Sequence, residues 1–71
     1  MNAINPKKLL NSKWTAVNPQ NKEKHFIITE VDYDELGLVI SCTIEAIISK
    51  REAAIEWREL KDNDCWKQGW L

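Results

Sequence analysis

The sequence predicts a mainly β domain: a small curled antiparallel sheet of three to five strands, with short helical turns at both termini and an SH3-like barrel as the closed alternative. Three observations support this prediction. Apolar and polar residues alternate over residues 38–48, and β-branched residues are concentrated in the same stretch. Four of the six aromatic residues are tryptophans, which are large enough to close the core of a 71-residue chain.

The central element is a β-hairpin over residues 36–60. The even positions of its first strand are all apolar: Leu38, Ile40, Cys42, Ile44, Ala46 and Ile48. A second alternation follows at Ala53, Ile55 and Trp57. With Lys50-Arg51 at the turn, one face would hold the pairs Ile48–Ala53, Ala46–Ile55 and Ile44–Trp57. Because the turn lacks an Asn-Gly or Asp-Gly pair, we expect a longer loop in the same register.

The segment before the hairpin predicts a turn and two strands. Residues 1–5 are expected to be disordered. Asn5 can cap a helical turn that begins at Pro6, because proline is pre-set for the first helical position. Residues 13–17 predict a short strand, and the turn-forming residues 18–21 end it. Residues 24–31 predict the next strand, but both of its faces are half apolar, so the pattern leaves the inner face open.

Glycine marks two turns. The acidic residues 32–37 form the turn into the hairpin, where Gly37 can take a positive φ. After Leu60, Asp62 can cap a short helix that runs through Gln68 and ends at Gly69. We expect this last segment to close an open end of the sheet.

Length and composition indicate one small domain over residues 1–71. Cys42 and Cys65 allow at most one disulfide. The chain shows no apolar leader at its start and no run near the roughly 20 apolar residues that span a bilayer. We therefore expect a cytoplasmic protein with two reduced thiols and no membrane association.

The residues that carry catalysis or bind metals and phosphates are sparse and scattered. His25 is the only histidine, and it is about 20 residues from Cys42, which is about 20 from Cys65. Zinc sites use ligand pairs that lie a few residues apart, and nucleophilic catalysis needs a base next to the serine or cysteine. The two glycines form no phosphate-binding loop. We therefore expect no enzyme activity, no metal and no cofactor.

Charge leaves two functional interpretations open. Residues 1–24 carry a net charge of +4 and residues 25–71 carry −5. The first interpretation is a non-catalytic interaction module for a protein or small molecule; a weak homodimer through a sheet edge or an exposed tryptophan is a further possibility. The second is RNA or single-stranded DNA binding, in which lysines hold phosphates and Trp14 or His25 stacks a base. The lysines concerned are Lys7, Lys8, Lys13, Lys22 and Lys24.

Short motifs spread over residues 7–70 form a specific combination. They are Lys7-Lys8-Leu9-Leu10, Ser12-Lys13-Trp14-Thr15-Ala16-Val17-Asn18-Pro19, Glu23-Lys24-His25-Phe26, Ser49-Lys50-Arg51, Trp57-Arg58-Glu59-Leu60-Lys61-Asp62, and Trp66 with Gly69-Trp70. Together they resemble a family of short tryptophan-rich bacterial proteins of unknown function. Residues 1–5 and the acidic turn at 32–36 lie outside this resemblance. The resemblance implies a small stand-alone bacterial protein and supplies no activity or site residue.

Overall fold

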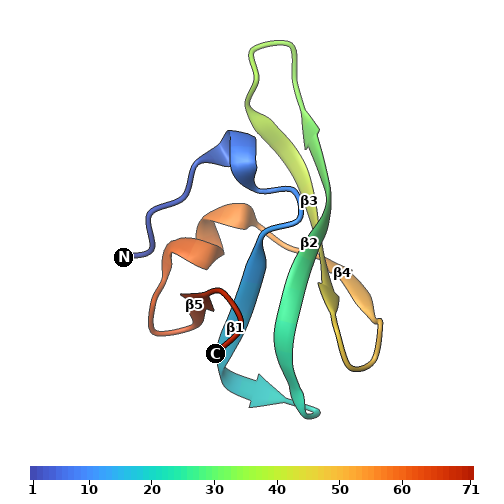
Figure 1. The fold of residues 1–71 in the computed structure, drawn as a ribbon. Coiled ribbons are helices and arrows are strands. Elements are labelled where there is room, and N and C mark those ends of the chain that lie inside the picture. Colours follow the sequence, from blue (N-terminus) through green and yellow to red (C-terminus); the bar gives the residue numbers. More distant parts are fainter.

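A computed structural model describes all 71 residues as one five-stranded antiparallel sheet with two 3-10 turns (Figure 1). The strands are β1 (Lys13–Gln20), β2 (Glu23–Tyr33), β3 (Val39–Ala46), β4 (Glu52–Ala54) and β5 (Trp66–Gln68). The 3-10 turns are η1 (Pro6–Lys8) and η2 (Trp57–Lys61). The predicted fold class is confirmed. No helix of the chain has the length and apolar character needed to cross a membrane.

The sheet is open. Its strand order is β4-β3-β2-β1-β5, so β4 and β5 are the two edges and do not pair with each other. Both edge strands have only three residues, whereas β2 has eleven and extends beyond its neighbours. The barrel alternative is therefore wrong, because edges this short cannot close a sheet whose central ribbon is so much longer.

The core lies on one face of the sheet, beneath η1 and η2 (Figure 1). Leu9 follows η1, Leu60 belongs to η2, and Ile28 comes from β2; each is 0–1% exposed. Complete burial of such a side chain stabilises the fold by about 1.5–3 kcal/mol. The remaining members of the core cluster are Trp14, Cys42, Ile44 and Trp57. Phe26 and Trp66 pack against its margin with their rings edge to face, 5.2 Å apart.

Pairing settles which face of β2 is inner. Phe26 pairs with Trp14 and Ala46, so Phe26 and Ile28 of β2 face the core. His25 and Ile27 therefore face outward. A one-residue bulge at Thr29 then moves the inward positions to odd numbers, starting at Val31.

The N-terminal cap is confirmed. The Asn5 side chain accepts a hydrogen bond from the Lys7 amide at 3.0 Å, and Pro6 opens η1. Residues 1–5, for which the sequence predicts disorder, lie along η2 and β5 in this structure. The Asn2 amide donates to the Lys61 carbonyl, and its side-chain nitrogen donates to the carbonyls of Leu60 and Trp66 at 2.8 Å.

The predicted turn at residues 18–21 is wrong, because β1 continues to Gln20. The turn consists of Asn21 and Lys22, whose φ angles of 55° and 62° suit a tight hairpin. Pro19 is tolerated in the strand because the β1–β2 register is interrupted between Thr15 and Gln20, where fewer ladder hydrogen bonds form.

The predicted register of the central hairpin is also wrong. The observed pairs are Thr43–Ala54, Ile44–Ala53 and Glu45–Glu52, four residues away from the prediction. An even shift keeps the same side chains on the same face, so the alternation alone could not distinguish the two registers. In the observed register, residues 47–51 form the loop between the two strands. Glu23 of β2 holds this loop by accepting hydrogen bonds from Ser49 and Arg51.

The predicted helix over residues 62–68 is absent. Asp62 ends η2, and residues 66–68 form β5, in which Trp66 pairs with Ala16 of β1. The predicted second strand of the hairpin likewise ends at Ala54, because Trp57 already belongs to η2. Gly37 and Gly69 both have φ of 81°, which confirms the positive φ predicted at these turns.

Candidate functional site

The outer face of β1, β2 and β5 brings lysine, histidine and tryptophan side chains close together. Thr15 lies opposite both His25 and Lys67 in the ladder, so these three share this face. The last three residues of the chain fold across it. Thr15 Oγ1 donates to the Gly69 carbonyl at 2.6 Å and accepts from the Leu71 amide at 3.0 Å. These bonds leave Thr15 only 4% exposed and fix the position of the residue between them, Trp70.

Trp70 lies at the surface, with 43% of the residue exposed. Its Nε1 donates to the Phe26 carbonyl at 2.9 Å, which anchors one edge of the indole. Lys13 Nζ lies 5.0 Å from the ring centroid, within cation–π range, and the His25 ring lies 6.1 Å away with a 39° tilt. His25 Nε2 in turn donates to the Leu71 carbonyl at 2.9 Å. An anchored aromatic ring is therefore bordered by a cation and an imidazole.

His25 also borders a cleft of about 300 Å³. The cleft is lined by Lys22, Lys24, His25, Ile47 and Ile48. Lys22 lies in the turn before β2, and Lys24 and His25 follow each other along β2, so they border the apolar residues Ile47 and Ile48 at the end of the sheet, where both faces meet the cleft. We refer to Lys13, Lys22, Lys24, His25, Lys67 and Trp70 as the lysine face.

None of the lysines of this face forms an ion pair. The two ion pairs of the chain are Arg58–Glu56, on the surface near η2, and Arg51–Glu23. Glu23, the acidic residue next to Lys22 and Lys24 in the sequence, is occupied by Arg51. Hydrogen bonds from Arg51 and then Ser49 lower the pKa of the Glu23 carboxyl. The lysines therefore keep their charge available for an anion.

The structure brings together four of the seven residues proposed from the sequence: Lys13, Lys22, Lys24 and His25. Trp14 lies on the opposite face and is only 2% exposed, with Nε1 donating to Ser12 Oγ at 2.9 Å. It belongs to the core, so the sequence-based suggestion that Trp14 stacks a base is wrong. Lys7 and Lys8 belong to η1, which covers the core face.

Two members of the lysine face were missed by the sequence prediction, Trp70 and Lys67. The sequence predicted a C-terminal helix that closes an end of the sheet, whereas residues 66–68 form β5, which pairs with β1. The motif Gly69-Trp70 carried a usable signal, because a glycine with positive φ can turn the chain from the edge of a sheet onto its face.

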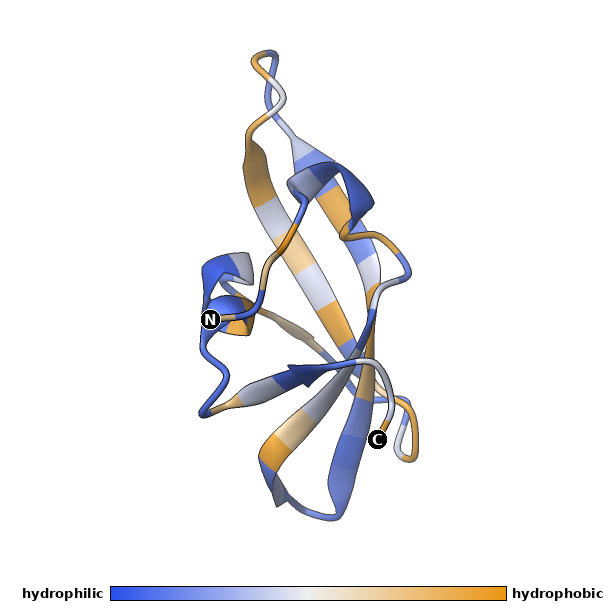
Figure 2. Cartoon of the chain, turned by 60° about the vertical axis from the view of Figure 1, so that its left-hand side comes forward, coloured by the Kyte–Doolittle hydropathy of each residue, from blue (hydrophilic) through white to orange (hydrophobic).

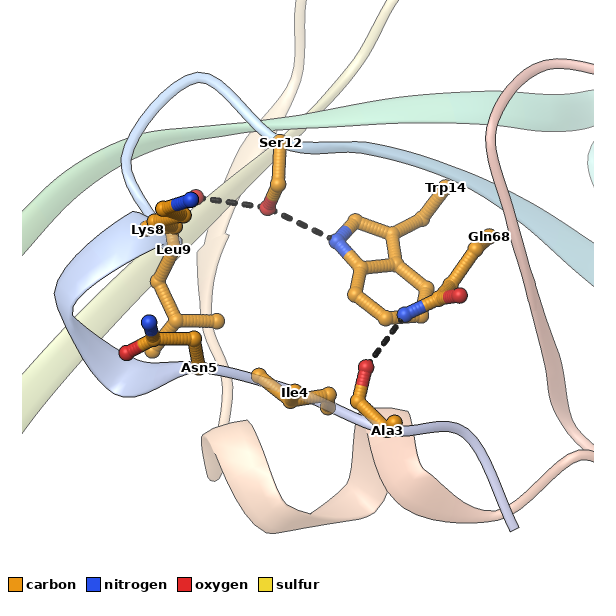
Figure 3. Close-up of a pocket in the computed structure, with 8 residues that line it drawn as sticks. All are labelled: Ala3, Ile4, Asn5, Lys8, Leu9, Ser12, Trp14 and Gln68. Atoms are coloured by element: carbon orange, nitrogen blue, oxygen red, sulfur yellow. Dashed lines mark hydrogen bonds between the residues drawn. The ribbon is translucent and has the colours of Figure 1, made fainter.

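A second cavity, of about 270 Å³, lies between the N-terminal segment and the inner face of β1 and β5 (Figure 3). Ile4, Leu9 and Trp14 supply its apolar wall. Two of its polar side chains are already partnered: Ser12 Oγ donates to the Leu9 carbonyl at 2.5 Å, and Gln68 Nε2 donates to the Ala3 carbonyl at 2.6 Å. Figure 3 shows these bonds tying the wall together, so this cavity serves the packing of the N-terminal segment.

Both cysteines are free. Cys42 is buried in the core, and burial raises the pKa of its thiol. Cys65 is exposed, and its thiol donates to Asp62 at 3.5 Å, a contact that raises its pKa. Neither thiol is hydrogen-bonded to His25. Raised thiol pKa values favour the protonated form, which is the less nucleophilic one.

The fold and the site define a class of protein: an open, five-stranded antiparallel β domain with a tryptophan-containing core and a cationic, aromatic outer face. The chain belongs to a family of tryptophan-rich proteins (DUF2389), whose model matches residues 12–71. No curated protein and no solved structure matches the chain. The resemblance to a tryptophan-rich family is thereby confirmed.

Proposed function

We propose that this protein is a non-catalytic binding module and that its lysine face binds single-stranded RNA or DNA. The observation that carries the proposal is Trp70, an exposed indole held in place beside cations. Single-stranded nucleic acids bind where basic groups track phosphates and aromatic rings stack on bases. Lys13 has a flexible stem, so it can leave the indole for a phosphate when a base stacks on the ring.

The cleft beside His25 extends the same surface. Lys22 and Lys24 are positioned for the phosphates of the neighbouring nucleotides, and Ile47 and Ile48 offer an apolar surface to a sugar or base. Across the ladder, Glu45 pairs with Ile27 on the same face and limits the lysine face on the β3 side. The binding path therefore runs over β1, β2 and β5 rather than across the whole sheet.

The test is titration of a fluorescently labelled octanucleotide of uridine or thymidine with the protein, followed by anisotropy at 50 mM salt. Four phosphate contacts predict a slope of about −3 in log affinity against log salt, or about 50-fold weaker binding at 200 mM. Trp70→Ala should weaken binding by about 5- to 150-fold, the range for loss of one stacked base.

Matched double variants distinguish a specific effect of the lysine face from a general effect of positive charge. Lys13→Gln with Lys67→Gln should weaken binding and lower the salt slope by about 1.4, whereas Lys7→Gln with Lys8→Gln, the same charge change on η1, should leave both nearly unchanged. Circular dichroism checks that each variant folds. Absence of binding at 50 mM salt, or equal effects of the two double variants, would reject the proposal.

Two observations support the cellular setting that we propose for this function. The two free thiols support a cytoplasmic location, because oxidising compartments favour disulfides. The motifs shared with short tryptophan-rich bacterial proteins support a bacterial source.

A further inference from the structure

The β2–β3 ribbon projects beyond the rest of the sheet as an arm, defined here as residues 30–41 (Figure 1). β1 pairs with β2 only as far as Ile27, and β4 pairs with β3 only from Thr43 onward. The edge of β3 that faces away from β2 is thus free of strand pairing over Val39–Ser41. One hydrogen bond ties the arm to η1, from the Tyr33 hydroxyl to the Pro6 carbonyl at 2.7 Å.

The arm exposes large apolar side chains. Leu36, Leu38 and Ile40 are 84%, 59% and 65% exposed. Hydrophobic segments are visible at the projecting end of the ribbon in Figure 2. Ile40 is the extra residue of a bulge in β3, which turns its side chain away from the regular alternation. A free strand edge flanked by exposed apolar residues is a template for the addition of another strand.

A small depression of about 40 Å³ lies at the base of this edge, between Ile40, Ile55 and Trp57. Trp57 is only 8% exposed, and its Nε1 has no hydrogen-bond acceptor in the chain. A buried donor without an acceptor is costly, and native structures rarely leave one unpaired. The depression is lined by Trp57 and has room for a small acceptor such as a carbonyl oxygen; a strand added at this edge would supply one, and a small movement of the lining side chains would bring it to the buried Nε1.

Charge selects the chemistry of the occupant. The arm contains Glu30, Asp32, Asp34 and Glu35 and no lysine or arginine. None of these four carboxylates takes part in an ion pair. Such a surface repels a nucleic acid and also repels the arm of a second copy, whereas it attracts lysine and arginine side chains.

We propose that the free edge of β3 at Val39–Ser41, together with the depression beside Trp57, binds an extended segment of another protein that alternates basic and apolar residues. The segment adds to the sheet as a sixth strand next to β3. Its apolar side chains pack on Leu38 and Ile40, its basic side chains face the carboxylates of the arm, and one of its carbonyls accepts from Trp57 Nε1.

The probe is a synthetic decapeptide in which valine and lysine alternate, titrated into ¹⁵N-labelled protein and followed by NMR. We expect amide shifts in residues 38–41 and a downfield shift of the Trp57 indole N–H as it gains an acceptor. A decapeptide in which valine and glutamate alternate should cause neither. An unchanged Trp57 indole signal at saturation, or equal binding of the two peptides, would overturn the proposal.

Variants locate the effect. Leu38→Ser with Ile40→Ser should weaken binding of the valine–lysine peptide at least tenfold. Ile48→Ser, which changes an equally exposed apolar residue outside the arm, should leave it unchanged; equal losses would overturn the proposal. Two other occupants would give different results. If sedimentation shows concentration-dependent dimerisation that Leu38→Ser with Ile40→Ser abolishes, the edge binds a second copy. If the octanucleotide shifts the amide signals of residues 38–41, the edge binds nucleic acid. Either result would refute a protein segment as the occupant, and neither depends on whether the lysine face binds nucleic acid.

Discussion

The two halves of the β2–β3 ribbon differ in what covers them, although the same alternation runs through both. In the covered half, Cys42, Ile44 and Ala46 of β3 are 1–5% exposed. In the arm, Leu38 and Ile40 hold the preceding even positions in the sequence, but the bulge at Ile40 passes the inward position to Val39, which packs against the core, and both remain mostly exposed. η2 and the C-terminal residues lie against the first half, and η1 touches the base of the arm through Tyr33, but none of them reaches the projecting end (Figure 1).

This contrast shows that an apolar stripe does not by itself report burial. Here β1 pairs with β2 only up to Ile27 and β4 pairs with β3 only from Thr43, so no further strand flanks the arm. Stability is therefore concentrated where the covering elements lie, and the uncovered half is left available for binding. Three predictions sharpen this contrast, in order of decreasing effect.

The largest effect is expected for Trp57→Ala in the covered half. Removal of a buried indole from the core cluster should lower the free energy of unfolding by about 3–5 kcal/mol, measured by urea denaturation. A domain of this size rarely has more than about 3–5 kcal/mol to lose, so the variant should be largely unfolded at 25 °C. Leu38→Ala in the arm should change the same quantity by less than about 0.5 kcal/mol. Similar losses in the two variants would contradict the division into halves.

Two threonines, one beneath the C-terminal residues and one where the arm begins, should respond to the same substitution with opposite signs. Thr15→Val removes the two hydrogen bonds of Thr15 Oγ1 to Gly69 and Leu71, and should cost about 1–3 kcal/mol while exposing the Leu71 amide to hydrogen exchange. Thr29 Oγ1 is buried without a partner, so Thr29→Val should raise the free energy of unfolding by about 1 kcal/mol. A loss of stability on Thr29→Val would mean that its hydroxyl has a partner, such as an ordered water.

The smallest of the three effects concerns the loop at residues 47–51 and depends on pH. Because Arg51 and Ser49 lower the pKa of Glu23 below its ordinary value of 4.5, the unfolded chain binds the proton first as the pH falls. The contribution of Glu23 is therefore fully present above pH 4.5 and is lost as the pH falls through the folded-state pKa. Glu23→Gln should lower the free energy of unfolding at pH 7. It should also make the urea midpoint fall less steeply as the pH drops below 4.5.

Glu52→Gln, at an exposed carboxylate of β4 outside both ion pairs, should leave the acid decline as it is in the unmodified protein. If both variants flatten it equally, general charge and not the contact with Arg51 and Ser49 causes the decline.

Much of the candidate site could be predicted from the lysines near the N-terminus, and its aromatic member could not. Lys13, Lys22, Lys24 and His25 lie close together in sequence on a hairpin, so local structure alone brings them together. Trp70 reaches them from 45 or more positions away, through the turn at Gly69 and two bonds to Thr15. Trp14, adjacent to Lys13, faces the core because neighbouring residues of a strand point to opposite faces.

The sequence by itself determined the β class, the cap at Asn5, the glycine turns and the presence of tryptophan in the core, because these depend on residue types and on spacing along the chain. Only the tertiary structure decided the register of β3 and β4, the open sheet and the exposed arm. A shift by an even number of residues preserves the alternation, so the pattern permits several registers. Contacts between distant residues, such as Glu23 with Arg51, select one of them.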